Sequence, residues 1–429
     1  MRRKNKIVGL VVLFFMFACS GVLRGQVRIS SPYSRYGLGE ITGCNFARTM
    51  AMGGLGYAVR DKYMVNMLNP ASYSGFDTLS FVCDVGLTAN FMQLQTIDTA
   101  QGFNEHTTFG YLVFGFPVTR WWGASLGLVP YSRAGYKLLA FDSIEGAGKY
   151  KGKYEGEGGL NRFFIGSGFR LHRDLSLGFN VSFLFGTLKN ISSVYLLDLP
   201  YVFDTRITNY TVINDFHFEA GLQYHHQLKK NYFINAGLVY QLPFGMKARK
   251  THLVERFTAS SSGYENTMDT VEYFPSQKGI IHLPGSIGGG VVVGQNDVWM
   301  IGLDVAWQNW KKYSSFGSSD SLKSSLHTAV GCMITPVHSS VSNYFRKMSY
   351  RAGFRYENTY LDLHDYQITE YGVSVGFGFP VRKSASSINV AFEYGQRGTT
   401  KYNLIKETFI RATLGVTIKE FWFFRRKLD

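Results

Sequence analysis

From about residue 78 to the end of the chain, short segments alternate apolar residues with small or polar ones. In one segment the apolar members are Leu175, Leu177, Phe179, Val181, Phe183 and Phe185, and between them lie Ser176, Gly178, Asn180 and Ser182, with Gly186 following. Near the end, Ile410, Ala412, Leu414, Val416 and Ile418 alternate with Arg411, Thr413, Gly415 and Thr417. Because successive side chains of a strand point to opposite faces, each segment predicts a strand with one apolar face. In a membrane barrel that face contacts lipid and the other lines the lumen. The pattern therefore predicts an all-β protein, a transmembrane antiparallel β-barrel.

The number and spacing of these segments indicate the kind of barrel. About fourteen can be counted, at 78–94, 105–119, 122–139, 152–170, 174–190, 207–227, 231–252, 272–293, 297–312, 324–335, 348–358, 366–381, 386–398 and 406–418. Most links on one side are short, and most links on the other are long and polar, namely 140–151, 191–206, 253–271 and 313–323. Outer-membrane barrels have short periplasmic turns and long extracellular loops. We therefore expect an integral protein of a bacterial outer membrane with both termini in the periplasm, although the link at 336–347 is longer than this scheme expects.

The chain begins with a targeting segment. Arg2, Arg3, Lys4 and Lys6 precede an apolar run at 7–18, which predicts a secretory signal peptide over residues 1–25. An alternative is lipidation at Cys19, because Met16-Phe17-Ala18-Cys19 resembles a lipobox. No later run approaches the ~18 apolar residues of a membrane helix, so a membrane span would have to use strands.

Three further regions follow the signal peptide. Residues 26–77 are rich in Gly, Ser, Asn and Met and lack sustained alternation, which favours a plug folded into the lumen. Residues 78–420 form the predicted barrel. Residues 421–429 form an aromatic and basic tail, suited to an interfacial anchor in the periplasm or to contact with a partner.

Composition and motifs argue against several functions. The net charge of +15 comes without a nucleic-acid recognition motif, so we assign it to a solvated surface or to one that faces outer-membrane lipids and lipopolysaccharide. The ten His residues show no metal-ligand spacing, and no Gly-x-Ser-x-Gly elbow marks a nucleophile. The glycine run 53–56 does not follow a strand, which argues against a dinucleotide loop. We expect no enzyme activity, metal or cofactor.

A family resemblance rests on the region before the first strand. The stretch Met50-Ala51-Met52-Gly53-Gly54-Leu55-Gly56-Tyr57-Ala58, then Arg60-Asp61, then Asn69-Pro70-Ala71, resembles the N-terminal hatch of FadL-type long-chain fatty-acid transporters. Leu283-Pro284-Gly285-Ser286 is similar to a strand entry common in that family, and residues 31–37 resemble the opening of a related group of Bacteroidetes outer-membrane proteins. The motifs cover about thirty residues, and the architecture covers nearly the whole mature chain.

The resemblance implies passive uptake or binding of hydrophobic small molecules such as long-chain fatty acids. The ligand would pass the hatch and leave sideways through a gap at a kinked or bulged strand, which the sequence does not locate. On this interpretation Gly53, Gly54 and Gly56 allow tight backbone turns, while Asn69, Pro70 and Ala71 shape the hatch. The same residues could equally pack a permanent plug.

Charged residues at predicted lumen positions point to an alternative function. They are Asp304, Arg351, Arg355, Glu357, Glu370, Glu393 and Arg411. We expect a polar network with pairs such as Arg355–Glu370 and Glu393–Arg411, which would fill and rigidify the lumen. The alternative is therefore a non-transporting barrel that serves as a subunit of an outer-membrane assembly or secretion complex, with other outer-membrane proteins as partners.

Overall fold

The computed structural model describes residues 31–43, 46–97, 101–145, 148–198, 202–260, 264–320, 322–336, 343–382 and 384–421. The predicted signal peptide, Cys19, residues 26–30 of the predicted plug and residues 422–429 of the predicted tail lie outside these ranges.

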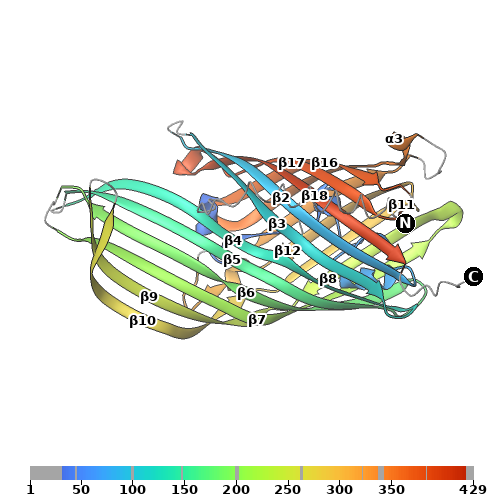
Figure 1. Ribbon diagram of the computed structural model, residues 1–429, viewed down its shortest axis with the longest axis horizontal. Helices are drawn as coiled ribbons and strands as arrows, with labels where there is room; N and C mark the ends of the chain where they lie inside the picture. Colours follow the sequence, from blue (N-terminus) through green and yellow to red (C-terminus); the bar gives the residue numbers. More distant parts are fainter. Residues whose placement is uncertain are drawn as a thin grey trace, which may run out of the picture.

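The described strands close into an antiparallel barrel (Figure 1). Its fourteen wall strands are β2 (Ser80–Gln95), β3 (Gln101–Pro117), β4 (Trp122–Ile144), β5 (Gly148–Arg170), β6 (Leu175–Leu196), β7 (Asp204–Gln227), β8 (Tyr232–Gln241), β11 (Ser286–Gln295), β12 (Trp299–Gln308), β14 (Ser325–Ile334), β15 (Ser349–Leu363), β16 (Tyr366–Pro380), β17 (Ser387–Arg397) and β18 (Lys406–Phe421). The last strand pairs with the first from Lys406↔Gln95 to Phe421↔Ser80, which completes the ring. The predicted fold class is confirmed.

Two predicted strands are each broken into two. The segment predicted at 231–252 is β8 followed by β9 (Phe244–Ala259), and the segment predicted at 272–293 is β10 (Glu265–Leu283) followed by β11. The breaks fall at Pro243 and at Pro284-Gly285, because a proline has no N–H to donate to a ladder. Below the breaks β11 lies between β8 and β12, and above them β9 pairs with β7 and β10.

Three of the predicted long loops are mostly strand, which corrects the sequence analysis. Strands β4 to β7, β9 and β10 continue through much of 140–151, 191–206 and 253–271. They form a wall that rises beyond the rest of the barrel (Figure 1). Polar residues lie on both faces of this wall, so these stretches lack the alternation that marks the lipid-facing strands. Above the barrel, β10 is an edge strand: among the described residues, its far side pairs only at Ile281 and His282, with β13 (Ser314–Ser315).

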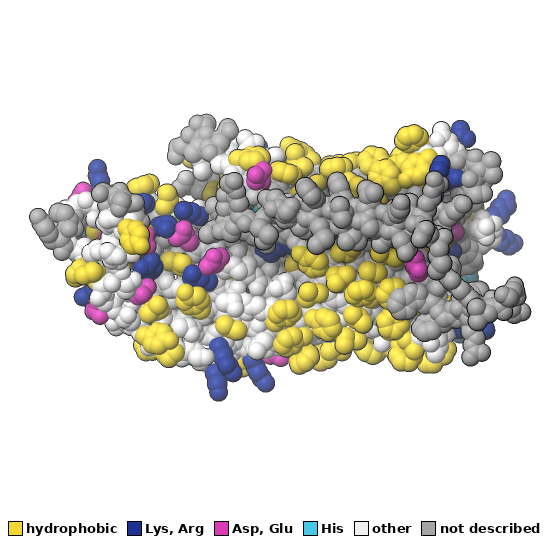
Figure 2. Space-filling model, viewed as in Figure 1, with side chains coloured by type: hydrophobic (Ala, Val, Ile, Leu, Met, Phe, Trp, Pro, Cys, Tyr) yellow, Lys and Arg dark blue, Asp and Glu magenta, His cyan; other side chains and the backbone are white. Residues whose placement is uncertain are grey.

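The predicted alternation is confirmed in the barrel wall. On β18, Ile410 and Leu414 are 47% and 38% exposed, whereas Thr413 and Thr417 are each 1% exposed. On the face in view, apolar side chains gather over the lower parts of β5, β6 and β7, and charged side chains are more frequent over the rising wall (Figure 2). Such an apolar band is suited to contact with lipid hydrocarbon.

Residues 31–77, called the N-terminal segment below, lie inside the ring. Their elements are η1 (Pro32–Arg35), β1 (Glu40–Ile41), α2 (Ala47–Met50) and η2 (Pro70–Gly75). Leu55 and Tyr73 have no exposed surface. The segment touches opposite sides of the wall, because η2 packs against β4 to β7 and α2 packs against β16 to β18. It therefore spans the lumen from one side of the wall to the other.

Beyond the N-terminal segment, the described chain has four short helices, each in a link between strands. They are η3 (Lys229–Asn231), η4 (Trp310–Lys312), α3 (Tyr344–Lys347) and η5 (Lys401–Asn403). The single turn of α3 lies at the end of the unexpectedly long link 336–347. Among the described residues, no helix has the length and apolar character needed to cross a membrane.

Candidate functional site

The N-terminal segment is held to the wall by buried hydrogen bonds. The Asp304 carboxylate on β12 accepts from the backbone N–H groups of Gly56 and Tyr57 at 2.6 Å and 2.8 Å. On β16, the Ser374 hydroxyl accepts from the N–H of Gly53 at 2.9 Å. Hydrogen bonds to a charged acceptor are the stronger kind, so Asp304 is a principal anchor for this segment.

The glycines that the sequence singled out have three different environments. Gly53 and Gly54 have φ angles of +71° and +91°, which favour glycine. A Cβ on Gly53 would lie 2.8 Å from the carbonyl oxygen of Phe354, whereas a Cβ on Gly54 would meet nothing closer than 4.0 Å. Gly56 has an ordinary φ, but a Cβ there would lie 2.3 Å from the Leu68 side chain.

Asn69, Pro70 and Ala71 form the start of η2 against the wall. The Asn69 side-chain oxygen accepts from the N–H of Ala71 at 3.1 Å, as a helix N-cap does. The Asn69 amide nitrogen donates to the carbonyls of Tyr57 and of Leu222 on β7, at 2.7 Å and 3.1 Å. One side chain therefore starts a helix, joins two parts of the N-terminal segment and fixes both to the barrel.

A cluster of charged side chains occupies the lumen beside strands β15 to β18. We call it the charged cluster, and its members are Glu40, Arg355, Glu357, Glu370, Glu393, Arg397, Glu407 and Arg411. Arg355 bonds both Glu370 and Glu393. Arg411 lies 3.4 Å from Glu393. Both pairs named in the sequence analysis therefore occur.

The charged cluster also ties the N-terminal segment to the wall. Glu40, on β1, lies 2.6 Å from Arg397 and 3.3 Å from Arg411. Burial alone would raise the pKa of Glu40, but the two guanidinium groups hold the pKa below its usual value. The Glu40 carboxylate is therefore charged when the segment is seated.

The cluster differs in membership from the predicted network. Asp304 and Arg351 lie elsewhere, since Asp304 anchors Gly56 and Arg351 bonds Asn389 at 3.2 Å. Arg397 and Glu407 were missed, although each lies an even number of residues from Glu393 or Arg411 on the same strand, so its side chain also points inward. That parity could have identified them, whereas nothing in the local sequence places Glu40 among them.

The wall is interrupted between β3 and β4. Their pairing runs from Pro117↔Gly123 to Leu112↔Leu128 and stops there, although β3 continues to pair with β2 and β4 continues to pair with β5. Register shifts occur just above the last pair, at Gly110 of β3 and at Tyr131 of β4. Bulges bend strands and end pairing, so they account for the interruption.

The N-terminal segment takes the place of β3 beside β4. Glu40 and Ile41 pair with Arg133 and Ser132, and the N–H of Thr42 donates to the carbonyl of Tyr131 at 3.0 Å. The Arg133 side chain reaches across the interruption to β3, where it donates to the Phe109 carbonyl at 2.9 Å. The interruption is thus covered from inside by residues 40–42 and bridged by one side chain.

An interior cavity reaches this interruption. Its volume is about 360 Å³, which is within the range of small-molecule sites. Near the interruption it is lined by Thr42, His106 and Arg133, and at its other side by Trp310 and Arg355. The cavity also touches Gly53 and Gly54, so two of the six predicted hatch residues lie along it.

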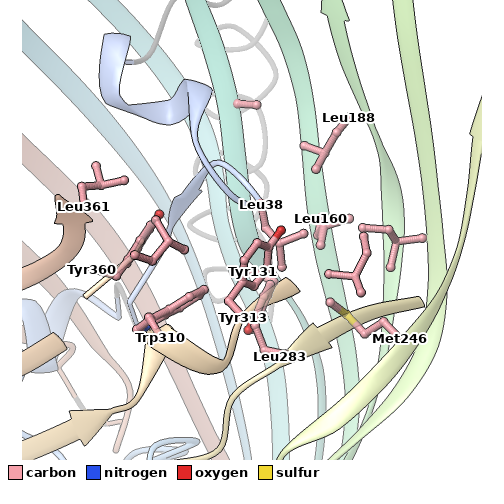
Figure 3. Close-up of a cluster of buried hydrophobic side chains, with 14 of the residues drawn as sticks. Leu38, Tyr131, Leu160, Leu188, Met246, Leu283, Trp310, Tyr313, Tyr360 and Leu361 are labelled. Atoms are coloured by element: carbon pink, nitrogen blue, oxygen red, sulfur yellow. The ribbon is translucent and has the colours of Figure 1, made fainter. Parts of the chain in front are cut away.

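A buried apolar cluster lies beside this cavity (Figure 3). Leu38 of the N-terminal segment lies near Tyr131, Leu283 and Tyr313, and the Trp310 ring stacks on Tyr360 with ring centroids 4.3 Å apart. Tyr131, Trp310 and Tyr360 also line the cavity. The cavity therefore has aromatic surface on one part of its lining and the charged cluster on another.

The described residues contain no group of three or more His, Cys, Asp or Glu side chains that could hold a metal ion.

Comparisons with known proteins identify a matching sequence family and solved structures with a similar fold. A family model described as BamG matches residues 4–429. By sequence, no curated protein matches the chain. The barrel is similar to the toluene transporter TodX of P. putida, with 15% identity, a TM-score of 0.56 and coverage of 89% of this chain and all of that one.

Two further solved structures share this FadL-type fold. The toluene transporter TbuX of Ralstonia pickettii has 14% identity and a TM-score of 0.55 over 92% of this chain and 99% of that one. A FadL homologue of Pseudomonas aeruginosa has 11% identity and a TM-score of 0.55 over 89% of this chain and 99% of that one. The TM-scores show that the fold is shared, and at identities this low the similarity shows the fold alone.

Proposed function

Because this chain belongs to the BamG family and has a FadL-type barrel, we propose that it is an outer-membrane protein that takes up hydrophobic small molecules passively. Long-chain fatty acids are the ligand class we propose. The single observation that carries the proposal is the interrupted β3–β4 wall together with an interior cavity that reaches it. A ligand released there would enter the apolar part of the membrane directly.

The route we propose runs along the N-terminal segment. A ligand would enter between the charged cluster and the aromatic side chains, where Trp310 and Tyr360 offer apolar surface. His106 and Arg133 line the cavity at the interruption, and a cation there suits a fatty-acid carboxylate. Residues 40–42 would then have to move away from β4, because they occupy the interruption.

A reversible cross-link across β1 and β4 tests this route. Ile41 and Ser132 are opposite each other in an antiparallel pair, a spacing that a disulfide can bridge. The Ser132 hydroxyl has no hydrogen-bond partner among the described residues, so its replacement costs little. We expect cells that express the variant with Ile41→Cys and Ser132→Cys to take up labelled oleate slowly when oxidised and at the wild-type rate after reduction.

The controls separate the route from the function. Each single cysteine variant should be insensitive to redox treatment, and peptide mass mapping should show the bridge. Equal uptake in the bridged and reduced states would exclude passage beside residues 40–42. If wild-type cells take up no more oleate or toluene than cells without the protein, transport itself is excluded.

A second function has a separate observation in its favour. The wall of β4 to β7, β9 and β10 rises beyond the barrel and ends in the edge strand β10, whose backbone is largely unpaired on one side among the described residues. Such a surface suits a non-transporting subunit of an outer-membrane assembly or secretion complex. Native mass spectrometry after gentle extraction distinguishes the two: a stoichiometric hydrophobic molecule supports uptake, and stable protein partners without a ligand support the subunit.

A further inference from the structure

A second cavity opens on the outer surface of the wall, where two strands break. It has a volume of about 550 Å³ and lies at Pro243, between β8 and β9, and at Pro284 and Gly285, between β10 and β11. We call it the wall groove. Its position is distinct from the β3–β4 interruption, because it lies at strands β8 to β12.

The lower lining of the wall groove is an apolar row across three neighbouring strands. Ile287 on β11 is paired with Tyr240 on β8 and with Trp307 on β12. These three side chains are 43%, 47% and 45% exposed and point away from the lumen. Aromatic side chains of this kind are enriched where hydrocarbon meets headgroups. The row therefore lies at a level suited to the upper end of an acyl chain.

The inner end of the wall groove is closed. Leu283 and Phe244 line it, and Leu283 is 2% exposed and packs in the apolar cluster of the interior (Figure 3). The Phe244 ring lies 4.8 Å from the His217 ring, measured between centroids. A molecule in the groove would therefore meet a packed interior, which suits residence rather than passage.

The polar lining of the wall groove has one sign of charge. After β12, the short helix η4 turns Trp310 inward, where it is buried, and leaves Lys311 and Lys312 exposed. Lys312 lines the groove together with His282 and Asn309, and no Asp or Glu lines it. Lys312 makes no ion pair within the described part of the chain. The groove thus combines an apolar lower part with an available cation near its upper part.

We propose that the wall groove binds one anionic lipid of the surrounding leaflet. An acyl chain would lie against Tyr240, Ile287 and Trp307, and a phosphate headgroup would contact Lys312. A lipid is the occupant that this lining fits, because it supplies an apolar chain and a negative headgroup in the required order. This inference does not depend on uptake through the interior.

Tryptophan quenching by brominated lipids tests the proposal, since Trp307 lines the wall groove. The purified full-length protein would be reconstituted with brominated phosphatidylglycerol or brominated phosphatidylcholine, and the Trp307 signal obtained by subtracting a Trp307→Phe variant. We expect phosphatidylglycerol to associate about fivefold more strongly, the factor expected for one lysine near an anionic surface. In Lys312→Gln, the association of phosphatidylglycerol relative to phosphatidylcholine should fall to within about twofold of one. Lys312→Arg should keep the wild-type ratio.

The matched control is Lys401→Gln. Lys401 is also exposed and lies in a three-residue 3₁₀ helix between barrel strands, but it does not line the groove. This variant should keep the wild-type preference. A preference near one in the wild type, or an undiminished preference in Lys312→Gln, would overturn the proposal. Displacement of the lipid by soluble glycerol phosphate would also overturn it, because the apolar lining would then have no part in binding.

Discussion

At the scale of single residues, inward-facing glycines decide how closely the N-terminal segment approaches the wall. A Cβ on Gly331 or Gly353 would lie 2.3 Å or 2.1 Å from backbone atoms of Met52. A Cβ on Gly237 would lie 1.9 Å from the carbonyl oxygen of Tyr57. Small residues on the lumen face therefore make room for a packed segment.

Gly53 and Gly54 provide a matched pair of substitutions. Both have positive φ, so alanine should cost about 1 kcal/mol at either position. Gly53→Ala should cost a further 1–3 kcal/mol, roughly, because its Cβ would meet the Phe354 backbone, whereas Gly54→Ala has open space. Hydrogen exchange of residues 46–60 would measure the difference. Equal protection in the two variants would contradict the role of this contact.

The same pair tests the hatch interpretation. Bulky residues at Gly53 and Gly54 should slow uptake without unfolding the barrel, because both glycines line the interior cavity. Normal uptake by folded variants would favour a permanent plug.

At the scale of elements, proline and bulge positions determine where the wall is continuous. Pro130 lies beside the bulge at Tyr131 in β4, above which pairing with β3 is absent. Pro243 and Pro284 lie at the breaks that form the wall groove. The alternation of apolar residues predicted the strands, but these local irregularities determine which strands have neighbours.

The hairpin of β9 and β10 is an element whose removal should separate the two proposed functions. Above the barrel it is attached mainly through β9 and β7, since β10 has little pairing on its far side. Replacing residues 254–272 with an Asn-Gly turn should leave the barrel folded, as judged by its heat-modifiable electrophoretic mobility. Uptake should persist if the protein is a transporter. If the protein is a complex subunit, copurification of its partners should be lost.

At the scale of the whole molecule, the charged cluster links the N-terminal segment to four strands of the wall. Arg355 contacts Glu370 and Glu393, and Arg397 contacts Glu40 and Glu370. Buried charges are costly unless each is paired. Unseating the N-terminal segment would therefore disturb pairs throughout this side of the barrel, which couples the stability of the segment to that of the wall.

Removal of one arginine should reveal this coupling. Arg355→Ala leaves two buried glutamates less compensated and should reduce the free energy of unfolding in urea by about 3–5 kcal/mol. Glu393→Gln in the same protein should recover part of the loss. The control is Lys323→Ala, whose ion pair with Asp362 is 41% exposed at the lysine and should contribute less than about 1 kcal/mol. Similar losses for Arg355→Ala and Lys323→Ala would contradict a coupled cluster.

The sequence by itself determined the class and order of the strands. Strands with a period of two and one apolar face are those of a barrel whose outer surface contacts lipid. The outward exposure of Ile410 and Leu414 follows that period. The pairs Arg355–Glu370 and Glu393–Arg411 were also predictable, because inward parity and strand order bring them close.

Only the tertiary structure decided where the wall opens and what covers it. The rising strands were predicted as loops because polar residues on both faces remove the periodic signal. The β3–β4 interruption depends on register shifts, and Glu40 joins the charged cluster only because residues 40–42 pair with β4. These contacts join positions far apart in the chain, so their partners depend on closure of the ring rather than on local sequence.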